Sequence, residues 1–178
     1  LLTGPAGQGK THTLIHEIRR TLASGGIAVG VLAQTLAAGG DLRTALSQHW
    51  GYADSFATFL DGLESAAAEK GQRALIAIDA LNETPNRQRW KQELAGIIRE
   101  VSERPHLALA LSVRSDYRLH VLPEFDAGSR PAWVEHRHSG FAGIEPEAML
   151  AYCRHYGVSA PVAPPVGELS NPLFVQLL

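Results

Sequence analysis

A glycine-rich stretch near the start of the chain, GPAGQGKTHT at residues 4–13, constrains the fold more than any other feature. It follows the apolar residues Leu1 and Leu2 and leads into a segment with helical periodicity over about 10–23. The glycines permit backbone angles that other residues avoid, so that N–H groups can point inward at an anion. The helix that follows would direct the positive end of its dipole at the same anion. The stretch therefore predicts a strand, an anion-binding loop and a helix, in that order.

The spacing of the loop matches the pattern G-x-x-x-x-G-K-[ST] through Gly4, Gly9, Lys10 and Thr11. Lys10 would supply a point charge to the outer phosphates of a nucleotide, and Thr11 a hydroxyl for Mg²⁺. A glycine turn with a chance lysine is the alternative, and it is disfavoured because the chain contains only three lysines. The residues of this stretch expected to contact the nucleotide are Gly4, Pro5, Ala6, Gly7, Gln8, Gly9, Lys10, Thr11 and His12.

Apolar runs alternate with helical segments along the rest of the chain. Runs of strand length lie at 27–34, 74–79 and 106–113, and a further run at 131–138 is a candidate fifth strand. The segments with helical character are about 41–50, 54–70, 87–103 and 145–157, with a last helix starting near 171. Because strands that are apolar throughout are typical of sheets covered on both faces, we predict an α/β fold. It would be a P-loop NTPase three-layer sandwich with a central, mainly parallel sheet, followed by the start of a small helical lid.

The length of 178 residues suits one domain with a small appendage. We predict a nucleotide-binding core over 1–140, with a truncated first strand, and the start of a helical lid subdomain over 141–178. The chain begins on what reads as the tail of a strand and ends at the opening of a helix, so we expect a fragment of a larger multidomain protein.

The composition argues against several classes of partner. A net charge of −2 gives no overall field that would attract nucleic acid or an anionic membrane. No apolar run approaches the ~20 residues of a membrane helix. The lone cysteine, Cys153, cannot form an internal disulfide, which suits a reducing cytoplasm. We therefore expect a cytoplasmic protein with no direct nucleic-acid or membrane partner.

Two further strand ends complete the expected site. Asp79 ends the buried run ALIAID, where ligands bind in open α/β sheets, and could hold Mg²⁺ beside Thr11. Glu83 is the nearest carboxylate that could orient water, and Arg114 ends the next run, from which it could reach the γ-phosphate. Each has a plainer alternative: Asp79 capping a turn, Glu83 in solvent or capping the next helix, and Arg114 on the surface.

Together these stretches resemble the STAND class of P-loop NTPases, and most closely its NACHT-like branch, over nearly the whole chain. GPAGQGKT looks like the Walker A motif, LIAIDALNE like the NACHT Walker B, and LALSVR is similar to the sensor strand that ends in Arg. HSGFAGIEPEAMLAYC is similar to the Gly-Phe element before the first lid helix, and SNPLFVQLL looks like the proline motif near the base pocket.

The resemblance implies a role for each matching residue. Lys10 and Thr11 would serve phosphate and Mg²⁺, Asp79 would serve Mg²⁺, and Glu83 would aid hydrolysis. Arg114 would read the γ-phosphate, and Pro172 would pack on the nucleotide from the lid side. Asn82 departs from the family pattern, because many members have a second acidic residue there; hydrolysis is therefore expected to be slow.

The resemblance also implies an ATP- and ADP-binding switch, linked to effector and sensor domains of the same chain and to trigger-dependent homo-oligomers in signalling or antiviral defence. An AAA+ motor is one alternative, although such motors usually carry Glu directly after the strand Asp, where this chain has Ala80. A nucleotide-dependent scaffold with negligible turnover is another. The N-K-x-D pattern of GTPases and the L-S-G-G-Q signature of transport ATPases are both absent from the sequence.

Overall fold

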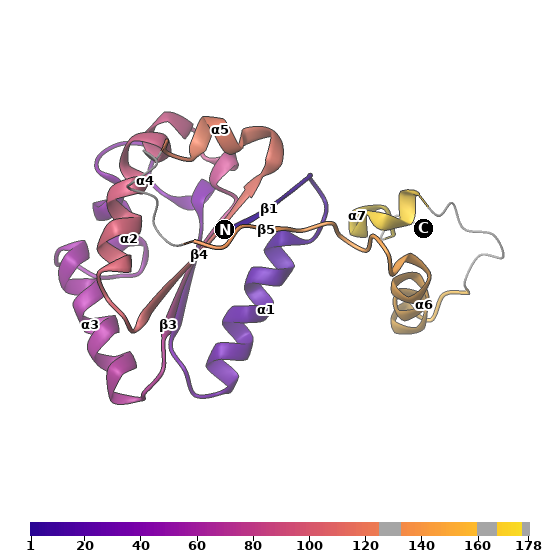
Figure 1. Cartoon of the computed structure of the whole chain (residues 1–178), viewed down its shortest axis with the longest axis horizontal. Coiled ribbons are helices and arrows are strands. Elements are labelled where there is room, and N and C mark those ends of the chain that lie inside the picture. The colour runs from indigo at the N-terminus through magenta and orange to yellow at the C-terminus, as the bar shows by residue number, and fades with distance from the viewer. Residues whose placement is uncertain (125–132, 160–166, 176–178) are drawn as a thin grey trace.

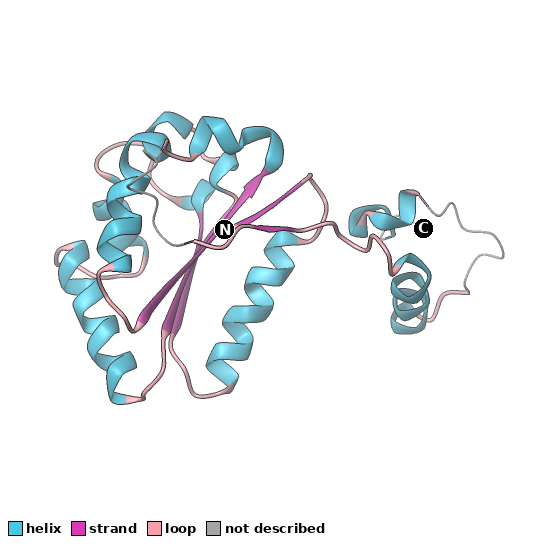
Figure 2. Ribbon diagram, viewed as in Figure 1, coloured by secondary structure: helices cyan, strands magenta, loops and turns pink. Residues whose placement is uncertain are grey.

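The structure, a computed structural model, describes residues 1–124, 133–159 and 167–175. Its centre is a five-stranded sheet with the strand order β2-β3-β4-β1-β5, in which every pairing is parallel. The strands are β1 (Leu2–Gly4), β2 (Ala28–Leu32), β3 (Ala74–Asp79), β4 (Leu107–Arg114) and β5 (His136–Arg137). The predicted central parallel sheet is therefore confirmed (Figures 1 and 2).

Helices cover the two faces of the sheet unequally. Among the helices that the structure describes, only α1 covers one face, while α2, α3 and α4 lie together on the other (Figure 1). The helices are α1 (Lys10–Ala23), α2 (Leu42–His49), α3 (Phe56–Glu69), α4 (Arg87–Ser102), α5 (Arg118–Val121), α6 (Glu145–Tyr156) and α7 (Pro172–Val175). Short 3₁₀ turns are η1 (Ala33–Thr35), η2 (Leu81–Glu83), η3 (Ser115–Tyr117) and η4 (Glu168–Ser170). The result is the three-layer arrangement that the sequence predicts.

Local sequence explains where the helices on the crowded face begin. The side chains of Asp41, Ser55 and Asn86 each accept a hydrogen bond from the backbone N–H three residues on, at 2.8, 3.2 and 3.2 Å. Such caps satisfy N–H groups that the first turn of a helix leaves without partners. Helix α1 differs, because it begins after Gly9, which has no side chain to act as a cap. Its first N–H groups therefore stay available to a ligand.

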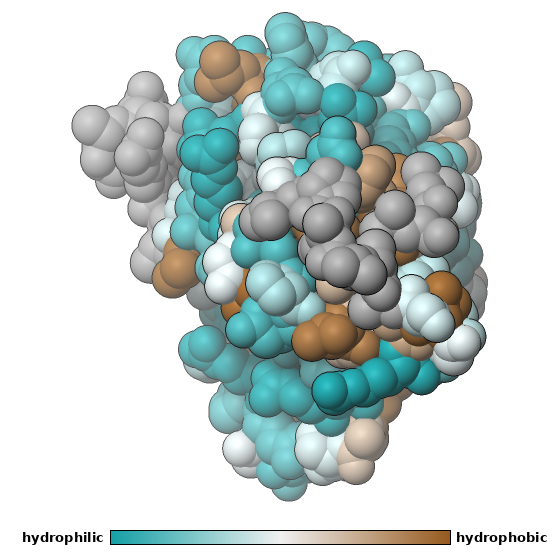
Figure 3. Space-filling model, turned by 90° about the vertical axis from the view of Figure 1, so that its right-hand side faces the viewer, coloured by the Kyte–Doolittle hydropathy of each residue, from teal (hydrophilic) through white to brown (hydrophobic). Residues whose placement is uncertain are grey.

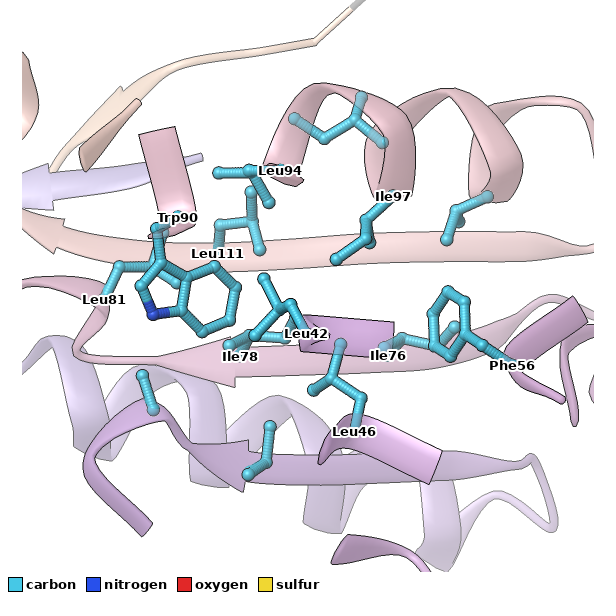
Figure 4. Close-up of a cluster of buried hydrophobic side chains, with 14 of the residues drawn as sticks. Leu42, Leu46, Phe56, Ile76, Ile78, Leu81, Trp90, Leu94, Ile97 and Leu111 are labelled. Atoms are coloured by element: carbon cyan, nitrogen blue, oxygen red, sulfur yellow. The ribbon is translucent and has the colours of Figure 1, made fainter. Parts of the chain in front are cut away.

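The main hydrophobic core lies between the sheet and the α2–α4 face (Figure 4). Trp90 is part of this core at 1% exposure, so even this large ring is almost completely covered. The side chains around it come from β3, β4, η2 and three helices; those labelled in Figure 4 include Leu42, Leu46, Ile76, Ile78, Leu81, Leu94, Ile97 and Leu111. This core fixes the positions of β3 and β4, whose carboxyl ends carry the candidate site.

The strand order creates a crevice at the carboxyl edge of the sheet. The connection after β1 runs to α1 on one face, whereas those after β3 and β4 run to helices on the other. Neighbouring parallel strands whose connections diverge in this way leave a crevice outside their carboxyl ends, where ligands bind. Here β1 lies beside β4, with Gly4 opposite Arg114.

The outer edge of β2 is occupied by a tryptophan. The indole N–H of Trp50 donates to the Gly30 carbonyl at 3.2 Å. The Trp50 ring also stacks on Phe59, with the centroids 4.9 Å apart. A side chain from the end of α2 therefore covers a backbone group that the sheet leaves unpaired.

A second, smaller hydrophobic cluster holds α6, η4 and α7 together, and these elements are called the lid below. Met149, Leu169 and Val175 are its buried members. The lid stands beside the core in Figure 1. Seen from that end, the surface is largely hydrophilic with scattered hydrophobic areas (Figure 3). In and next to the lid elements, the apolar residues Ile144, Leu150, Val158 and Leu173 are exposed. The boundary of the lid near residue 140 stays a prediction.

Some local expectations differ from the structure. Of the candidate strand 131–138, only His136–Arg137 pair with β1; residues 131–132 lie outside the described residues, as do 160–166 and the end of the last helix at 176–178. Helix α5 and the 3₁₀ turns were not predicted, because turns of three or four residues carry too little periodicity to be seen.

Within the described residues, no helix is long and apolar enough to cross a membrane.

Candidate nucleotide-binding site

A cavity of about 290 Å³ lies at the carboxyl ends of β1, β3 and β4. This is near the lower end of the roughly 300–1,000 Å³ typical of small-molecule sites. Its lining consists of Ala6, Gly7, Gln8, Gly9, Lys10, Thr11, His12, Asp79, Ala80, Asn82, Glu83, Ser112, Arg114, Pro172 and Leu173. The fold thus brings together eleven predicted site residues from four separate parts of the sequence. A larger cavity of about 520 Å³ beside Leu107–Leu109 and Trp133 contains none of them.

The glycine loop holds its lysine by backbone contacts. Gly7 and Gly9 have φ angles of 74° and 91°, in the left-handed region that favours glycine. The Lys10 ammonium donates to the carbonyls of Gly4 and Pro5 at 2.9 and 2.6 Å. These two residues do not line the cavity and instead orient the lysine. The other residues predicted in this stretch, 6–12, all belong to the cavity wall.

Electrostatics favour an anion beside Lys10. Burial lowers the pKa of Lys10, and the nearby Arg114 guanidinium lowers it further, whereas the Asp79 and Glu83 carboxylates act in the opposite direction. Within the described residues, Lys10 forms no ion pair. A phosphate near the ammonium would therefore stabilise its charged form.

The Asp79 carboxylate is buried, at 5% exposure, and only half satisfied. Its Oδ1 accepts a hydrogen bond from the Ser112 hydroxyl, which in turn accepts from the Ala80 N–H at 2.9 Å. Its Oδ2 is buried without a hydrogen-bond partner. Because an unsatisfied buried carboxylate oxygen is costly, this atom calls for a cation or a donor. Carboxylate and hydroxyl oxygens suit Mg²⁺, and Thr11 lines the same cavity, so the residues present fit this metal.

An unusual backbone conformation at Ala80 sets the direction of the turn after β3. Ala80 has a φ of 55° and is the only non-glycine residue with positive φ among those the structure describes. Alanine in the left-handed region is strained, and such residues cluster at functional sites. The turn buries Leu81 and Asn82 and leaves Glu83 exposed at the cavity wall.

Asn82 ties the ends of β3 and β4 together. Its side-chain Oδ1 accepts from the backbone N–H of Arg114 at 2.9 Å, and its carbonyl accepts from Arg87 Nε at 2.7 Å. Asn82 is 4% exposed, so this contact is shielded from water. Asn82, which stands where many NACHT-like proteins have an acidic residue, thus joins two strand ends in this chain.

Arg114 lies at the wall of the cavity with one carboxylate partner. Its Nη2 donates to Asp116 Oδ2 at 2.9 Å, and its guanidinium carbon lies 5.1 Å from the centroid of the Tyr117 ring. Its Nε is buried without a hydrogen-bond partner. The side chain therefore has donor capacity left for a ligand.

The lid packs on the loop where the loop has no side chains. A Cβ atom on Gly7 would lie 2.8 Å from Asn171 Oδ1, and the nearest such neighbour of Gly9 is Pro172 Cγ at 3.9 Å. Gly140, with a φ of 64°, lies against Gln8 Oε1 and the Ser170 carbonyl, which leave no room for a Cβ. Pro172 is thus at the site, as the family resemblance implies, and its role there stays a prediction.

His138 connects β5 to the start of α1. Its Nδ1 accepts from the Gly140 N–H at 3.1 Å, so Nε2 carries the hydrogen and donates to Thr13 Oγ1 at 2.8 Å. Burial lowers the pKa of His138, and the positive charges of His136 and Lys10 act in the same direction. A neutral imidazole with this tautomer fits both hydrogen bonds.

Several residues at the site were missed from the sequence. Ser112 carried a signal, as a polar residue inside a buried strand two positions before Arg114. Asn171, Leu173 and His138 belong to stretches that carry the family resemblance, but their contacts with the loop could not be predicted, because these contacts depend on how the lid folds back. In the part of the chain that the structure describes, no three His, Cys, Asp or Glu side chains group as a metal site.

Comparisons with known proteins support the fold. No protein-family profile matches the sequence, and no curated protein does. The chain is similar to the structure of Cdc6p from Pyrobaculum aerophilum, with 16% identity and a TM-score of 0.54 over 95% of this chain and 46% of that one. It therefore spans less than half the length of that protein. Drosophila ORC bound to AT-rich DNA and Cdc6 matches with 13% identity and a TM-score of 0.44, over 87% of this chain and 61% of that chain. The likeness to Cdc6p confirms the predicted P-loop type of α/β fold.

Proposed function

We propose that this chain is an ATP-binding module that hydrolyses ATP slowly and acts as a nucleotide-dependent switch of the STAND, NACHT-like kind. One observation carries the proposal: the glycine loop with Lys10 and the half-satisfied buried carboxylate of Asp79 line the same cavity. The first is suited to phosphate and the second to a divalent cation. A site for Mg²⁺ with a nucleoside triphosphate is the ligand chemistry that satisfies both.

Each residue of the site has a distinct task in this proposal. The N–H groups at the start of α1 and the Lys10 ammonium bind the β- and γ-phosphates. Thr11 and Asp79 would hold Mg²⁺, which would supply charge neutralisation to the phosphates. Ser112 orients Asp79 through its hydrogen bond to Oδ1. Arg114 and the lid residue Pro172 close on the opposite side of the nucleotide.

Glu83 is the proposed aid to hydrolysis. It is an exposed carboxylate at the cavity wall, and its charge acts against the lowering of the Lys10 pKa by burial. A carboxylate in this position can orient a water molecule and accept its proton. Loss of the γ-phosphate then removes contacts to Lys10 and Arg114, and a ligand shifts a conformational equilibrium only through such differences in contact.

An ATPase of the AAA+ type is the second candidate, and the likeness in fold to Cdc6p favours it. Ala80 argues against a motor of this type, because it stands where such motors usually have Glu. The residue is also held in a strained turn that directs Glu83, three positions later, to the cavity. The first candidate, the STAND, NACHT-like switch, includes further proposals. These are effector and sensor domains, trigger-dependent assembly of homo-oligomers and a role in cytoplasmic signalling or defence.

Replacing Lys10 by Ala tests the phosphate site. One lost charged contact is worth about 1.5–3 kcal/mol, so we expect ATP affinity to fall by roughly 10- to 150-fold. Isothermal titration with Mg²⁺-ATP measures this change, and Lys70→Ala, at a lysine bonded to the Gly25 carbonyl, is the control. Equal affinity in the wild type and the Lys10 variant would remove the basis of the proposal.

Replacing Glu83 by Gln separates the switch from a scaffold. The substitution keeps the size of the side chain and removes the proton acceptor, so turnover is expected to fall by about 10²- to 10⁴-fold. ATP affinity should change little. Phosphate release under saturating ATP is the measurement. A wild type without turnover, or a variant as active as the wild type, would favour the scaffold or another base.

A further inference from the structure

We propose that Asp116 competes with the terminal phosphate of a bound nucleotide for Arg114, and so limits how strongly the site prefers a triphosphate to a diphosphate. The inference rests on the proposed function, because it concerns the same nucleotide site. It adds a specificity-determining residue that neither the sequence motifs nor the cavity lining indicates.

The geometry of the Arg114–Asp116 pair is local. Arg114 ends β4 and Asp116 lies two residues later in η3, with Nη2 and Oδ2 2.9 Å apart. Asp116 is 65% exposed and Arg114 35% exposed, so the carboxylate faces water while the guanidinium reaches the cavity wall. A pair so close in sequence needs little chain ordering to form, and it is available before any ligand arrives.

The pair leaves Arg114 able to bind a second anion. Its Nε is buried without a partner, and the Tyr117 ring lies beside the guanidinium at 5.1 Å. A guanidinium has five N–H donors, and an anion in the cavity can use those that Asp116 does not. A ligand oxygen must nevertheless share the positive charge with a carboxylate already in place.

The charge of Asp116 also reaches the phosphate-binding lysine. Burial lowers the pKa of Lys10; Arg114 adds to this lowering and Asp116 acts against it, so both members of the pair act electrostatically at the loop. A negative charge at this range repels a γ-phosphate and partly neutralises the arginine that would bind it. Both effects weaken triphosphate binding, and both affect a diphosphate less, because it lacks the phosphate that faces Arg114.

The test is Asp116→Asn in the full chain, titrated in parallel with a non-hydrolysable ATP analogue and with ADP, both with Mg²⁺. Exposed ion pairs are worth at most about a fivefold change in an equilibrium. We therefore expect the analogue to bind about three- to fivefold more tightly and ADP to change less than about twofold. The gain should shrink as salt is raised, since exposed charges are screened. A gain in affinity for one nucleotide cannot arise from a damaged fold.

Asp61→Asn is the matched control. Asp61 pairs with Arg104 at 2.7 Å and is 66% exposed, close to the 65% of Asp116. Neither Asp61 nor Arg104 lines the nucleotide cavity, so this change should leave both affinities as they are. In an Arg114→Gln background, the gain from Asp116→Asn should fall below about twofold, because only the direct repulsion of the phosphate remains to be relieved.

The outcomes distinguish a failure of the proposed nucleotide binding from a failure of the proposed role of Asp116. If the wild type binds neither nucleotide, the proposed function and this inference both fail. If it binds both but Asp116→Asn leaves the ratio of affinities unchanged or lowers it, only the role of Asp116 is overturned. A weaker triphosphate complex in the variant would mean that Asp116 positions Arg114 rather than competing for it.

Discussion

At the level of single residues, the candidate site depends on two polar contacts between the turn after β3 and the end of β4. Ser112 holds one oxygen of Asp79, and Asn82 holds the backbone N–H of Arg114. Ser112, Asp79 and Asn82 are buried, and both contacts fix a residue that lines the cavity. The relative position of the proposed metal ligand and the proposed phosphate sensor is therefore set by side chains that are themselves not charged.

The Asn82 contact can be tested by comparing two substitutions. Asn82→Ala leaves the Arg114 N–H without an acceptor, which is expected to lower the free energy of unfolding by about 1–3 kcal/mol. Asn82→Asp keeps an acceptor oxygen and should cost less, while adding a negative charge beside the cavity. Urea denaturation measures both variants. If the two lose equal stability, the amide has no specific role in joining the strands.

Some of these residues could be predicted and others could not, for physical reasons. Lys10, Thr11, Asp79 and Arg114 sit at the ends of apolar runs or in a spaced motif, so their place at the carboxyl edge follows from sheet geometry. The left-handed turn at Ala80 carries no signal, because alanine rarely adopts it. Glu83 could be placed near the cavity, but its orientation depends on that turn.

At the level of elements, the contact between the lid and the glycine loop requires residues without side chains on both sides. Gly7 of the loop lies against Asn171, and Gly140 before α6 lies against Gln8 and Ser170. A methyl group on Gly140 would collide with the backbone carbonyl of Ser170, whereas one on Gly7 would require the Asn171 side chain to move. The sequence predicts the lid helix at 145–157 and a candidate strand at 131–138, but not this contact, because contacts between distant segments leave no periodic pattern.

Gly140→Ala is expected to disturb the lid more than a comparable change nearby. Gly143→Ala is the control, because Gly143 also has a positive φ, of 86°, but a methyl group there would meet no atom within 4 Å. Both changes carry the strain of a left-handed alanine, about 1–2 kcal/mol. Only Gly140→Ala should also weaken nucleotide affinity, by about tenfold or more if the lost contact is worth about 1.4 kcal/mol. Equal nucleotide affinities in the two variants would show that the lid contact does not support binding.

At the level of the whole molecule, one histidine takes part in the connection between two hydrophobic clusters, beside the contacts of the lid with the glycine loop. The main core holds the sheet and α2–α4, and the small cluster holds the lid. His138 lies between them, bonded to Thr13 of α1 and to the Gly140 N–H. The protonation state of one imidazole therefore affects how the lid is attached to the core.

This arrangement predicts how stability depends on pH. Burial lowers the folded-state pKa of His138 below its ordinary value of 6.5, so the unfolded chain binds more protons below pH 6.5. The contribution of His138 is therefore complete above that pH and is lost as the pH falls further. Denaturation between about pH 7.5 and 5.5 should show a smaller loss for His138→Gln, which stays neutral and keeps a donor and an acceptor. The same loss in both proteins would assign the effect to the other histidines.

The tryptophan on β2 has a consequence for how molecules meet one another in solution. An unpaired edge strand is a template on which a strand from another chain can add, and this is a common start of aggregation. The Trp50 indole occupies the Gly30 carbonyl, and its stacking on Phe59 holds the ring there. An incoming strand would first have to displace a half-buried ring that packs against the core. The edge strand β2 is thus protected from pairing with a strand of another copy of the protein.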